Sequence, residues 1–501
     1  MYRISISTMT PETIMRKQAF KRLRPRDTMM DADAKMPIGN TGSVDSSLSD
    51  PLLFDIYSQA DFMREFDVNS HKINSIKYYP NILFGQSSHK ITQKIRSRVA
   101  IGFQQRIFTK RLTALIGNNV SMRLIRGGSS LRGQQNMLAV FREGWEEKDM
   151  EIAMHEALTS DGKTGDCAVC FYMSNSKLGW RTFSFENGDI LYPHYDPMAG
   201  ELSVFGRLYS MIDDTGETAE YLDVYDMSSY MRYKRDKTAS WKIDVTPTPH
   251  GFTECPIAYH RYGNPYWAPS QDLIDGYEVA LSQFCENNAA YALRILYAIG
   301  QSMEVTASTD GTPMRIDSPD PNAKVGFLEP ADASASFMAQ LEAIEKNIMR
   351  SSFAVETPEI KSGSDMSSLT VKMLFADTYL KALEDAQRYQ KFLAKATRLF
   401  KYGYGVEIGR ISDMNTFKVK AEFTPFIFMS ETETINSIVQ LVGSGVLSKK
   451  TASEIAYESG YGTADEWDRI INEAHEEYTA AQQQAQSLNI ISESRNGGNN
   501  A

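Results

Sequence analysis

The feature that most constrains the fold is a run of more than thirty residues, from Leu369 to Tyr402, that contains neither proline nor glycine. At about 1.5 Å per residue such a run predicts a helix of roughly 50 Å, which is unusual in a compact enzyme. A second long helix is expected from Ser270 to Gly300, because serine and nearby aspartates suit a helix start and glycine suits its end. A shorter helix is expected from Ala335 to Arg350 on an apolar stripe.

Between Cys167 and Tyr262 the pattern changes to short β-rich runs separated by turn clusters such as DDTG and DPMAG. Antiparallel strands are expected in CAVCFYM, GRLYSMI, EYLDVYD, SYMRYK and SWKIDV. Upstream, the apolar periodicity indicates helices, including a single amphipathic helix from Asn136 to Leu158. A strand in FKVKAEFTPF is followed by helices, of which those introduced by Ser430 and Thr463 have capping-box spacing. The predicted fold class is α+β, mainly helical.

The distribution of charge is uneven. The chain of 501 residues has a formal net charge of −10, so it is not a protein that binds nucleic acid through bulk positive charge. Residues 68–142 nevertheless carry thirteen Lys or Arg and no Asp or Glu, whereas residues 431–480 carry ten carboxylates and three bases. This split indicates that the basic segment (residues 68–142) meets a polyanion or the acidic part of a neighbouring copy, or that it is a solvated face.

Residue types that carry catalysis are scattered. Gly162-Lys163-Thr164 lacks the first glycine of a phosphate loop, since Ala157 stands there, and a β-turn before the next strand is the simpler interpretation. Cys167 and Cys170 have metal-site spacing but no second pair, so buried thiols are expected. No Asp or Glu lies beside His, Ser or Cys residues in a pattern that would indicate a nucleophile with its base. We therefore expect no enzyme activity, no metal site and no cofactor.

The number of cysteines and the hydropathy bear on location. Four cysteines in so long a chain do not make a disulfide framework, which favours a reducing cytoplasm. The N-terminus lacks a signal-peptide pattern, and no run of about 18 uncharged apolar residues occurs. Secretion and membrane spanning are therefore not expected.

The order of these segments resembles a known family. HGFTECPIAYHRYGN at His250 to Asn264, followed by QDLIDGYEVALSQF, is similar to the wing-to-stem junction of tailed-bacteriophage portal proteins, also called head-to-tail connectors. SGSDMSSLTVKMLF at Ser362 to Phe375 resembles the loop-to-helix entry of that family, and GVLSKKTASEIAYESGYGTADEWDRIINE resembles its helical C-terminal segment. The resemblance covers roughly residues 50 to 480, and the order of the motifs is more specific than any one of them.

The resemblance implies a wing, stem, clip and crown arrangement, with residues 1–50 added as a flexible N-terminal arm. The implied parts are the wing (51–269), the first stem helix (270–300), the clip (301–334), the second stem helix (335–350), the tunnel loop (351–366), the long helix and wing return (367–429), the helical crown (430–489) and a disordered tail (490–501).

The resemblance also implies a function. Portal proteins form a ring of about twelve copies at one capsid vertex. This ring is the channel through which double-stranded DNA is packaged and ejected. The implied partners are the major capsid protein, the terminase motor, the head-tail adaptor and double-stranded DNA, with no membrane. The implied location is the portal vertex of the virion, with assembly in the host cytoplasm.

Physical reasoning assigns residues to these roles. A mostly acidic channel lets DNA slide, and the tunnel-loop residues expected to touch it are Glu356, Glu359 and Lys361. The stem is expected to pack against neighbouring copies through Tyr277, Leu281, Phe284 and Tyr291. For the basic segment we favour contact with DNA or the capsid, through Lys94, Arg96, Arg98, Arg106, Lys110 and Arg111.

Two other classes stay open on the sequence alone. A different neck or tail protein of the virion would also oligomerise without catalysis, although adaptors are usually shorter and need no pair of stem helices. A soluble DNA-processing enzyme would need carboxylate, His or Gly-rich clusters that the sequence does not provide.

Overall fold

The structure is a computed structural model in which the chain divides into two compact units. The first unit comprises Met1–Pro358 with Asp377–Phe426, and the second comprises Glu359–Ala376 with Ile427–Ala501. The described residues are 9–15, 23–25, 54–56, 58–84, 92–125, 131–212, 216–236, 239–292, 295–299, 304–306, 315–317, 324–328, 334–354, 375–426, 431–458, 466–467 and 469–479.

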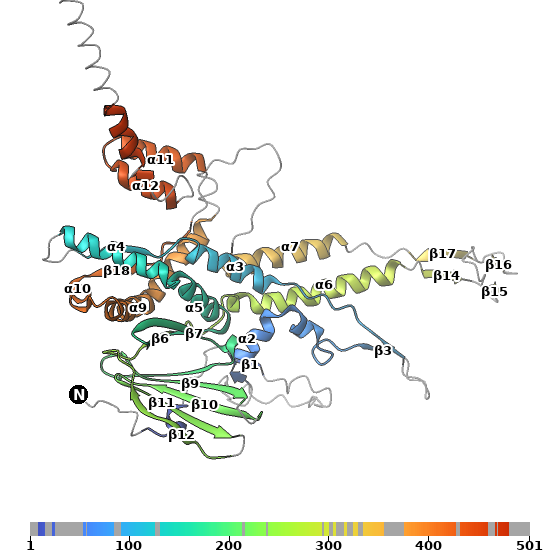
Figure 1. The fold of residues 1–501 in the computed structure, drawn as a ribbon. Helices are drawn as coiled ribbons and strands as arrows, with labels where there is room; N and C mark the ends of the chain where they lie inside the picture. The colour runs from blue at the N-terminus through green and yellow to red at the C-terminus, as the bar shows by residue number, and fades with distance from the viewer. Residues whose placement is uncertain are drawn as a thin grey trace, which may run out of the picture. The chain divides into compact units, whose positions relative to one another are not determined.

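The first unit is a mixture of helices and antiparallel sheets, which confirms the α+β class (Figure 1). Its main hydrophobic core lies among helices, where the rings of Phe141, Trp145 and Phe400 pack within 6.0 Å of one another. The helices that contribute to this core are α2 (Gln59–Phe66), α3 (Phe103–Ile116), α4 (Leu131–Glu147), α5 (Met150–Thr164), α6 (Gln271–Ala292), α7 (Ser334–Ser351), α9 (Ala376–Glu407) and α10 (Ile411–Thr416).

Two helix predictions in this region are wrong in detail. The single helix expected from Asn136 to Leu158 is divided into α4 and α5, because Asp149 has a left-handed backbone with φ of 52°. Gly162-Lys163-Thr164 is the last turn of α5 rather than a β-turn, and the helix ends at Gly165, which has φ of 81°. Glycine suits this end because a left-handed residue is strained when it carries a Cβ.

The β-rich region forms two sheets. The five-stranded sheet has the order β12-β11-β10-β9-β8, and the three-stranded sheet has the order β13-β6-β7. All five predicted runs lie in strands of these sheets, and β7, β8 and β13 were not predicted. The bounds are β6 (Cys167–Ser174), β7 (Lys177–Phe183), β8 (Ile190–Tyr195), β9 (Leu202–Ile212), β10 (Thr218–Tyr225), β11 (Ser229–Asp236), β12 (Lys242–Pro249) and β13 (Ile257–His260).

The predicted buried thiols are confirmed. Cys167 and Cys170 are free cysteines on β6 with at most 3% of their surface exposed. Burial raises the pKa of Cys170 to about 12, so it is protonated and unreactive at neutral pH.

Residues 9–15 of the predicted flexible arm are docked on the five-stranded sheet. Ile14, at the end of the short helix α1 (Pro11–Ile14), is fully buried against Val204, Leu222 and Met231. Its carbonyl oxygen lies 2.7 Å from Nε2 of His194. The prediction of a flexible arm is therefore wrong for this segment. Burial of the aliphatic side chain of Ile14 among these apolar side chains is more favourable than its exposure to water. Most of residues 1–50 lie outside the described residues.

The side chain of Ile14 has room on the sheet because residue 206 is glycine, which has no side chain. A Cβ at Gly206 would lie 2.6 Å from Cγ2 of Ile14. We expect Gly206→Ala to destabilise the first unit by about 1–3 kcal/mol through overpacking, measured by urea unfolding. In the background of Ile14→Ala, which lacks Cγ2, the same substitution should cost much less. An equal cost in both backgrounds would contradict the contact.

Two antiparallel helices, α6 and α7, are joined by a β-rich module (Figure 1). The prediction that α6 extends to Gly300 is wrong, since the helix ends at Ala292 and Ile295–Ile299 form β14. Branched and aromatic residues in ILYAI favour a strand paired with a partner. The module pairs β14 with β17 (Lys324–Leu328) and β15 (Glu304–Thr306) with β16 (Arg315–Asp317).

The expected helix at 335–350 is present as α7, and the chain leaves it through a turn at Phe353, whose φ is 58°. The hydroxyl group of Thr378, on α9, donates to the carbonyl oxygen of Phe353 at 2.7 Å. The long helix expected at 369–402 is described from Ala376 and extends to Glu407. Residues 355–374, which include most of the predicted tunnel loop, lie outside the described residues.

Short two-stranded pairs complete the first unit. They are β1 (Leu23–Pro25) with β2 (Phe54–Ile56), β3 (Ile82–Phe84) with β4 (Thr92–Lys94), and β5 (Ser121–Leu124) with β18 (Val419–Glu422). The last pair confirms the strand expected in FKVKAEFTPF. No described helix is long and apolar enough to cross a membrane.

The second unit is helical where it is described. It contains α11 (Glu431–Gly443), α12 (Lys449–Glu458) and a helical stretch at residues 469–479. The helices expected after Ser430 and Thr463 are thus present, and the predicted disordered tail at 490–501 lies outside the described residues.

Candidate functional site

The candidate site is the face of α6 that meets the basic segment. Four polar residues of α6, Asp275, Glu278, Ser282 and Glu286, recur every three or four positions, so they lie on one face of the helix. Each of them contacts the basic segment. The contacts therefore form a polar ladder (Asp275, Glu278, Ser282 and Glu286) along about three turns of the helix.

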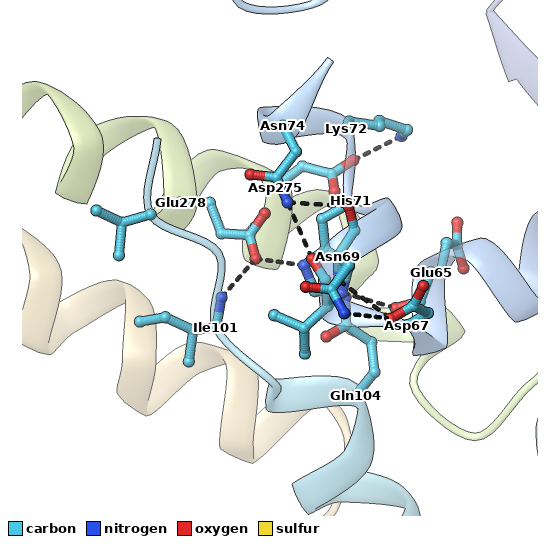
Figure 2. A network of polar contacts seen from close by, with 12 residues as sticks. Glu65, Asp67, Asn69, His71, Lys72, Asn74, Ile101, Gln104, Asp275 and Glu278 are labelled. Carbon is cyan, nitrogen blue, oxygen red and sulfur yellow. Dashed lines mark hydrogen bonds and ion pairs between the residues drawn. The ribbon is translucent and has the colours of Figure 1, made fainter. Parts of the chain in front are cut away.

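The centre of the polar ladder is a buried pair. Figure 2 shows His71 and Glu278 facing each other, with Nδ1 of His71 2.6 Å from Oε1 of Glu278. The same carboxylate oxygen accepts a hydrogen bond from the backbone N–H of Ile101 at 2.9 Å. The other ring nitrogen of His71 lies 3.0 Å from the carbonyl oxygen of Glu65. Because both ring nitrogens face oxygen acceptors, the imidazolium form satisfies the site best.

The charge of His71 follows from competing effects. Burial lowers the pKa of the imidazole, but the hydrogen bond and negative charge of Glu278 raise it, with smaller contributions from Glu65 and Asp275. The net effect is a pKa above the ordinary value of 6.5. His71 therefore carries more positive charge near neutral pH in the folded chain than in the unfolded chain.

The two ends of the polar ladder are ion pairs. Nζ of Lys72 lies 2.6 Å from Asp275. Arg96 donates from Nε to Oε1 of Glu286 at 3.0 Å and from Nη2 to Oε2 at 3.1 Å, which is a bidentate geometry. Between them, the backbone N–H of Val99 donates to Oγ of Ser282 at 3.0 Å. Two positive charges of the basic segment, on Lys72 and Arg96, are therefore paired with carboxylates of the same chain.

A second buried pair connects the basic segment to α9. The guanidinium group of Arg111, on α3, lies 2.6 Å from Asp385, and both side chains are 4% exposed. Arg111 also donates to the carbonyl oxygen of Tyr266 at 2.9 Å, and the hydroxyl of Tyr262 donates to the same carboxylate at 3.3 Å. Burial lowers the pKa of Arg111, but the charge of Asp385 and both tyrosines outweigh burial and raise it.

One turn further along α9, Tyr389 binds a third buried carboxylate. Its hydroxyl group donates to Oδ2 of Asp161 at 2.6 Å, and it lies 2.9 Å from the hydroxyl of Tyr266. Nδ1 of His260 lies 2.9 Å from the same oxygen of Asp161. Burial raises the pKa of Tyr389 well above its ordinary value, so it remains a donor. Asp385 and Tyr389 together fix α9 to α3, α5 and the chain after β13.

These contacts decide which predicted DNA or capsid contacts are accessible. The prediction that Arg111 contacts DNA or the capsid is not kept, because a guanidinium group that is 4% exposed and paired with Asp385 does not reach a phosphate outside the chain. Arg96 is engaged with Glu286, and Arg98 donates to the carbonyl oxygen of Tyr79 at 2.9 Å. Arg106 is 43% exposed and lies 3.9 Å from Glu345, whereas Lys110 is half-buried on α3. For Lys94 the structure describes the backbone in β4 and not the side chain.

The residues expected to pack between copies lie on the opposite face of α6. The Tyr277 ring meets the Phe103 ring edge-on at 5.2 Å, and the Phe284 ring lies 5.7 Å from the Phe337 ring of α7. Leu281 packs against the main core. These three side chains therefore find partners within the chain, which the sequence alone did not reveal. The side chain of Tyr291 is outside the described residues, as are Glu356, Glu359 and Lys361.

With two faces engaged, α6 presents a third face. Among the described residues of α6, the exposed ones on this face are Asp272, Gly276, Gln283 and Asn287, and Leu273 is exposed at its edge. The face is therefore mostly polar, with one charged and one large apolar residue among the five. It is the part of α6 that remains available to a neighbouring molecule.

Sequence reasoning missed the polar ladder. The spacing of Asp275, Glu278, Ser282 and Glu286 was a visible signal of a polar helix face, but the partners lie about 200 positions earlier in the chain. Among the described residues no group of three or more His, Cys, Asp or Glu side chains is placed to hold a metal ion.

Comparison with known proteins identifies the family. A family model described as phage portal protein, SPP1 Gp6-like, matches residues 59–477, which is most of the chain. No curated protein matches the chain significantly. The matched region contains the polar ladder, the α6–α7 pair with its β-rich module, α9 and most of the second unit. Family membership implies a structural protein of the virion that forms an oligomeric ring at a capsid vertex. The chain belongs to the phage portal protein family, SPP1 Gp6-like.

Proposed function

We propose that about twelve copies of this chain form a ring around a channel for double-stranded DNA, used in packaging and later in ejection. The observation that carries the proposal is the family match across residues 59–477, which spans the expected wing, stem, clip and crown. The antiparallel α6–α7 pair with its strand module supports it, since the resemblance implies two stem helices around a small clip.

The same reasoning proposes docking partners. The module of β14 to β17, at the far end of α6 and α7, is the proposed clip, to which the terminase motor docks first and the head-tail adaptor later. The wing is the proposed contact with the major capsid protein. The polar ladder and the buried contacts of Asp385 and Tyr389 on α9 suit a role as a channel. A channel that withstands packaging forces needs helices that are fixed to the surrounding domain.

The channel itself is proposed to be poor at holding DNA. The net charge of −10 per chain multiplies around a ring, and negative charge repels phosphates. Glu356, Glu359 and Lys361 remain the proposed tunnel-loop contacts. Of the basic segment, Lys94 and, on α3, Arg106 and Lys110 remain the proposed contacts with DNA or the capsid.

The test is electron microscopy of the purified chain with a mass measurement of the particles. We expect rings of about twelve copies with a central opening wide enough for a DNA duplex. The rings should bind duplex DNA weakly and lose that binding as salt is added, because any contact is local and electrostatic. A stable monomer at high protein concentration, without rings, would argue against the proposal.

A further inference from the structure

A basic surface lies on α9, outside the basic segment of residues 68–142. The second half of this helix carries four cations, Lys391, Lys395, Arg398 and Lys401. Their spacing of three or four positions places them on one side of the helix, over about 15 Å of its length. Lys391 and Arg398 are exposed, and Lys395 and Lys401 are half-buried. This side of α9 is therefore positively charged and accessible.

The chain before and within β18 runs along the same part of α9 (Figure 1). Nε2 of Gln390 donates to the carbonyl oxygen of Ala421 at 2.8 Å. Nζ of Lys401 donates to the carbonyl oxygen of Phe417 at 3.1 Å. Because the earlier helix residue meets the later strand residue, the two segments are antiparallel neighbours.

The outer side of β18 adds further cations to this surface. Phe417 and Ala421 are buried, so the alternation of side chains along a strand places Lys418 and Lys420 on the outer side. Arg123 of β5 is the register partner of Lys420, and its side chain is 63% exposed. The cations of α9, β18 and β5 together form one basic face (Lys391, Lys395, Arg398, Lys401, Lys418, Lys420 and Arg123).

Two carboxylates offset part of the charge of the basic face. Glu254 is shared by Lys395, whose Nζ lies 2.5 Å away, and by Arg398, whose Nη2 lies 3.3 Å away. Glu422 is shared in the same way by the two cations of the β5–β18 pair. Seven cations and two carboxylates leave a surplus of five positive charges among the described residues of this surface.

The surplus is concentrated around Lys401. Within the part of the chain that the structure describes, Lys391, Lys401 and Lys418 form no ion pair. Burial and the positive charges of Arg398 and Lys418 lower the pKa of Lys401. The three cations therefore repel one another in the unbound chain, and a bound anion would relieve this repulsion.

The anion that suits the basic face carries many charges close together. Duplex DNA has one negative charge for about every 1.7 Å of its axis, so a short stretch meets several of these cations at once and releases their counterions. Lysine and arginine contact phosphates without reading the base sequence. A disordered acidic peptide would also have to be ordered on binding, which lowers its affinity.

We infer that the basic face of α9, β18 and β5 is a binding site for the phosphate groups of double-stranded DNA. The site lies outside the basic segment and outside the proposed tunnel loop. One chain is enough to form it, so the inference goes beyond the proposed ring and channel and does not depend on them.

Charge removal in the full-length protein tests the site. We expect Arg398→Gln, Lys401→Gln and Lys418→Gln, combined, to weaken binding of a fluorescent duplex at least about tenfold. The slope of log affinity against log salt should fall by about 2 to 3, because each lost phosphate contact removes about 0.9. The matched control removes the same charge from exposed positions on other elements, through Arg64→Gln, Arg181→Gln and Lys242→Gln. Equal effects of the two triple variants would overturn the inference.

A measurement on the unaltered protein keeps the test independent of how the variants fold. Lysines are acetylated with and without the duplex, and each site is quantified by mass spectrometry. We expect the duplex to slow acetylation of Lys391 and Lys418 at least about fivefold, while the exposed Lys242 on β12 reacts at the same rate in both samples. Lysines of the basic face that react as fast with the duplex as without it would contradict the site.

Competitors decide between sources of negative charge. We expect duplex DNA to protect Lys391 and Lys418 at a lower concentration of charge than tripolyphosphate or a polyglutamate peptide. Protection by tripolyphosphate at the same phosphate concentration would assign the site to a free polyphosphate and overturn the duplex. Stronger protection by polyglutamate would assign it to an acidic protein, with the same consequence. None of these outcomes bears on whether the chain forms rings, so the proposed function is tested separately.

Discussion

Replacing Arg111 by methionine is expected to destabilise the first unit by about 3–5 kcal/mol, because it leaves a buried carboxylate without its main cation. The partner is Asp385, which is 4% exposed. Lys381 lies 3.1 Å from the same carboxylate and offsets part of the loss. Urea unfolding of the full-length protein, at one fixed concentration and followed by tryptophan fluorescence, measures the effect.

The control for Arg111 removes both charges. Arg111→Met combined with Asp385→Leu should recover much of the loss, since an apolar pair of similar volume tolerates burial. Arg106→Met, on an exposed position of the same helix, should change stability by no more than about 0.5 kcal/mol. If Arg111→Met proved as mild as Arg106→Met, the anchor between α3 and α9 would be excluded.

Replacing Glu278 by alanine is the second large effect that we expect. It leaves the buried Nδ1–H of His71 without an acceptor, at about 1–3 kcal/mol, and the half-buried N–H of Ile101 without an acceptor at a smaller cost. Glu278→Gln, which keeps an oxygen acceptor of the same length, should cost less than the alanine substitution. Equal costs for the two variants would show that the negative charge of Glu278, rather than an oxygen acceptor, matters at this position.

The His71–Glu278 pair also predicts a dependence on pH. The pKa of His71 is raised in the folded chain, so the folded state binds the proton more tightly than the unfolded state. The resulting stabilisation is complete below the unfolded value of 6.5 and is lost as pH rises through the folded value. The difference in stability between the wild type and His71→Gln should therefore shrink as the pH is raised from 6 upward, in a series of urea titrations. A difference that is constant with pH would contradict a charged His71.

The strands could be predicted where the chain marks both ends of each with turn residues. β10 and β11 carry alternating apolar residues between clear turn clusters, and they lie where the sequence indicates. β7 was missed because Gly179 is its third residue, and a glycine inside a strand weakens the strand signal. In the structure Gly179 pairs with Tyr172, whose ring covers it so closely that a Cβ would lie 2.5 Å from Cζ. A long-range aromatic contact therefore stabilises a strand whose local sequence is weak.

The helices show where local reasoning fails. Asp149 ends α4 by taking a left-handed backbone, although neither glycine nor proline marks the break. α6 ends at Ala292 because the following residues pair with β17, about 30 positions later in the chain. The candidate site has the same limit: the acids of α6 follow a readable spacing, but their partners are determined by the folded chain. The family, in contrast, follows from the order of the elements, which local errors do not change.

The turn at Phe353 and its hydrogen bond from Thr378 have a consequence for the insertions and deletions that this chain tolerates. Because these two residues meet, the ends of the intervening segment are held together at one point of the first unit. The entropy of closing a loop grows slowly with its length, by about 0.6 kcal/mol for each doubling. We therefore expect insertions and deletions between residues 354 and 377 to change the free energy of unfolding little and to leave α7 and α9 in place. The length and the sequence of this segment can therefore change without a change in the domain that carries it.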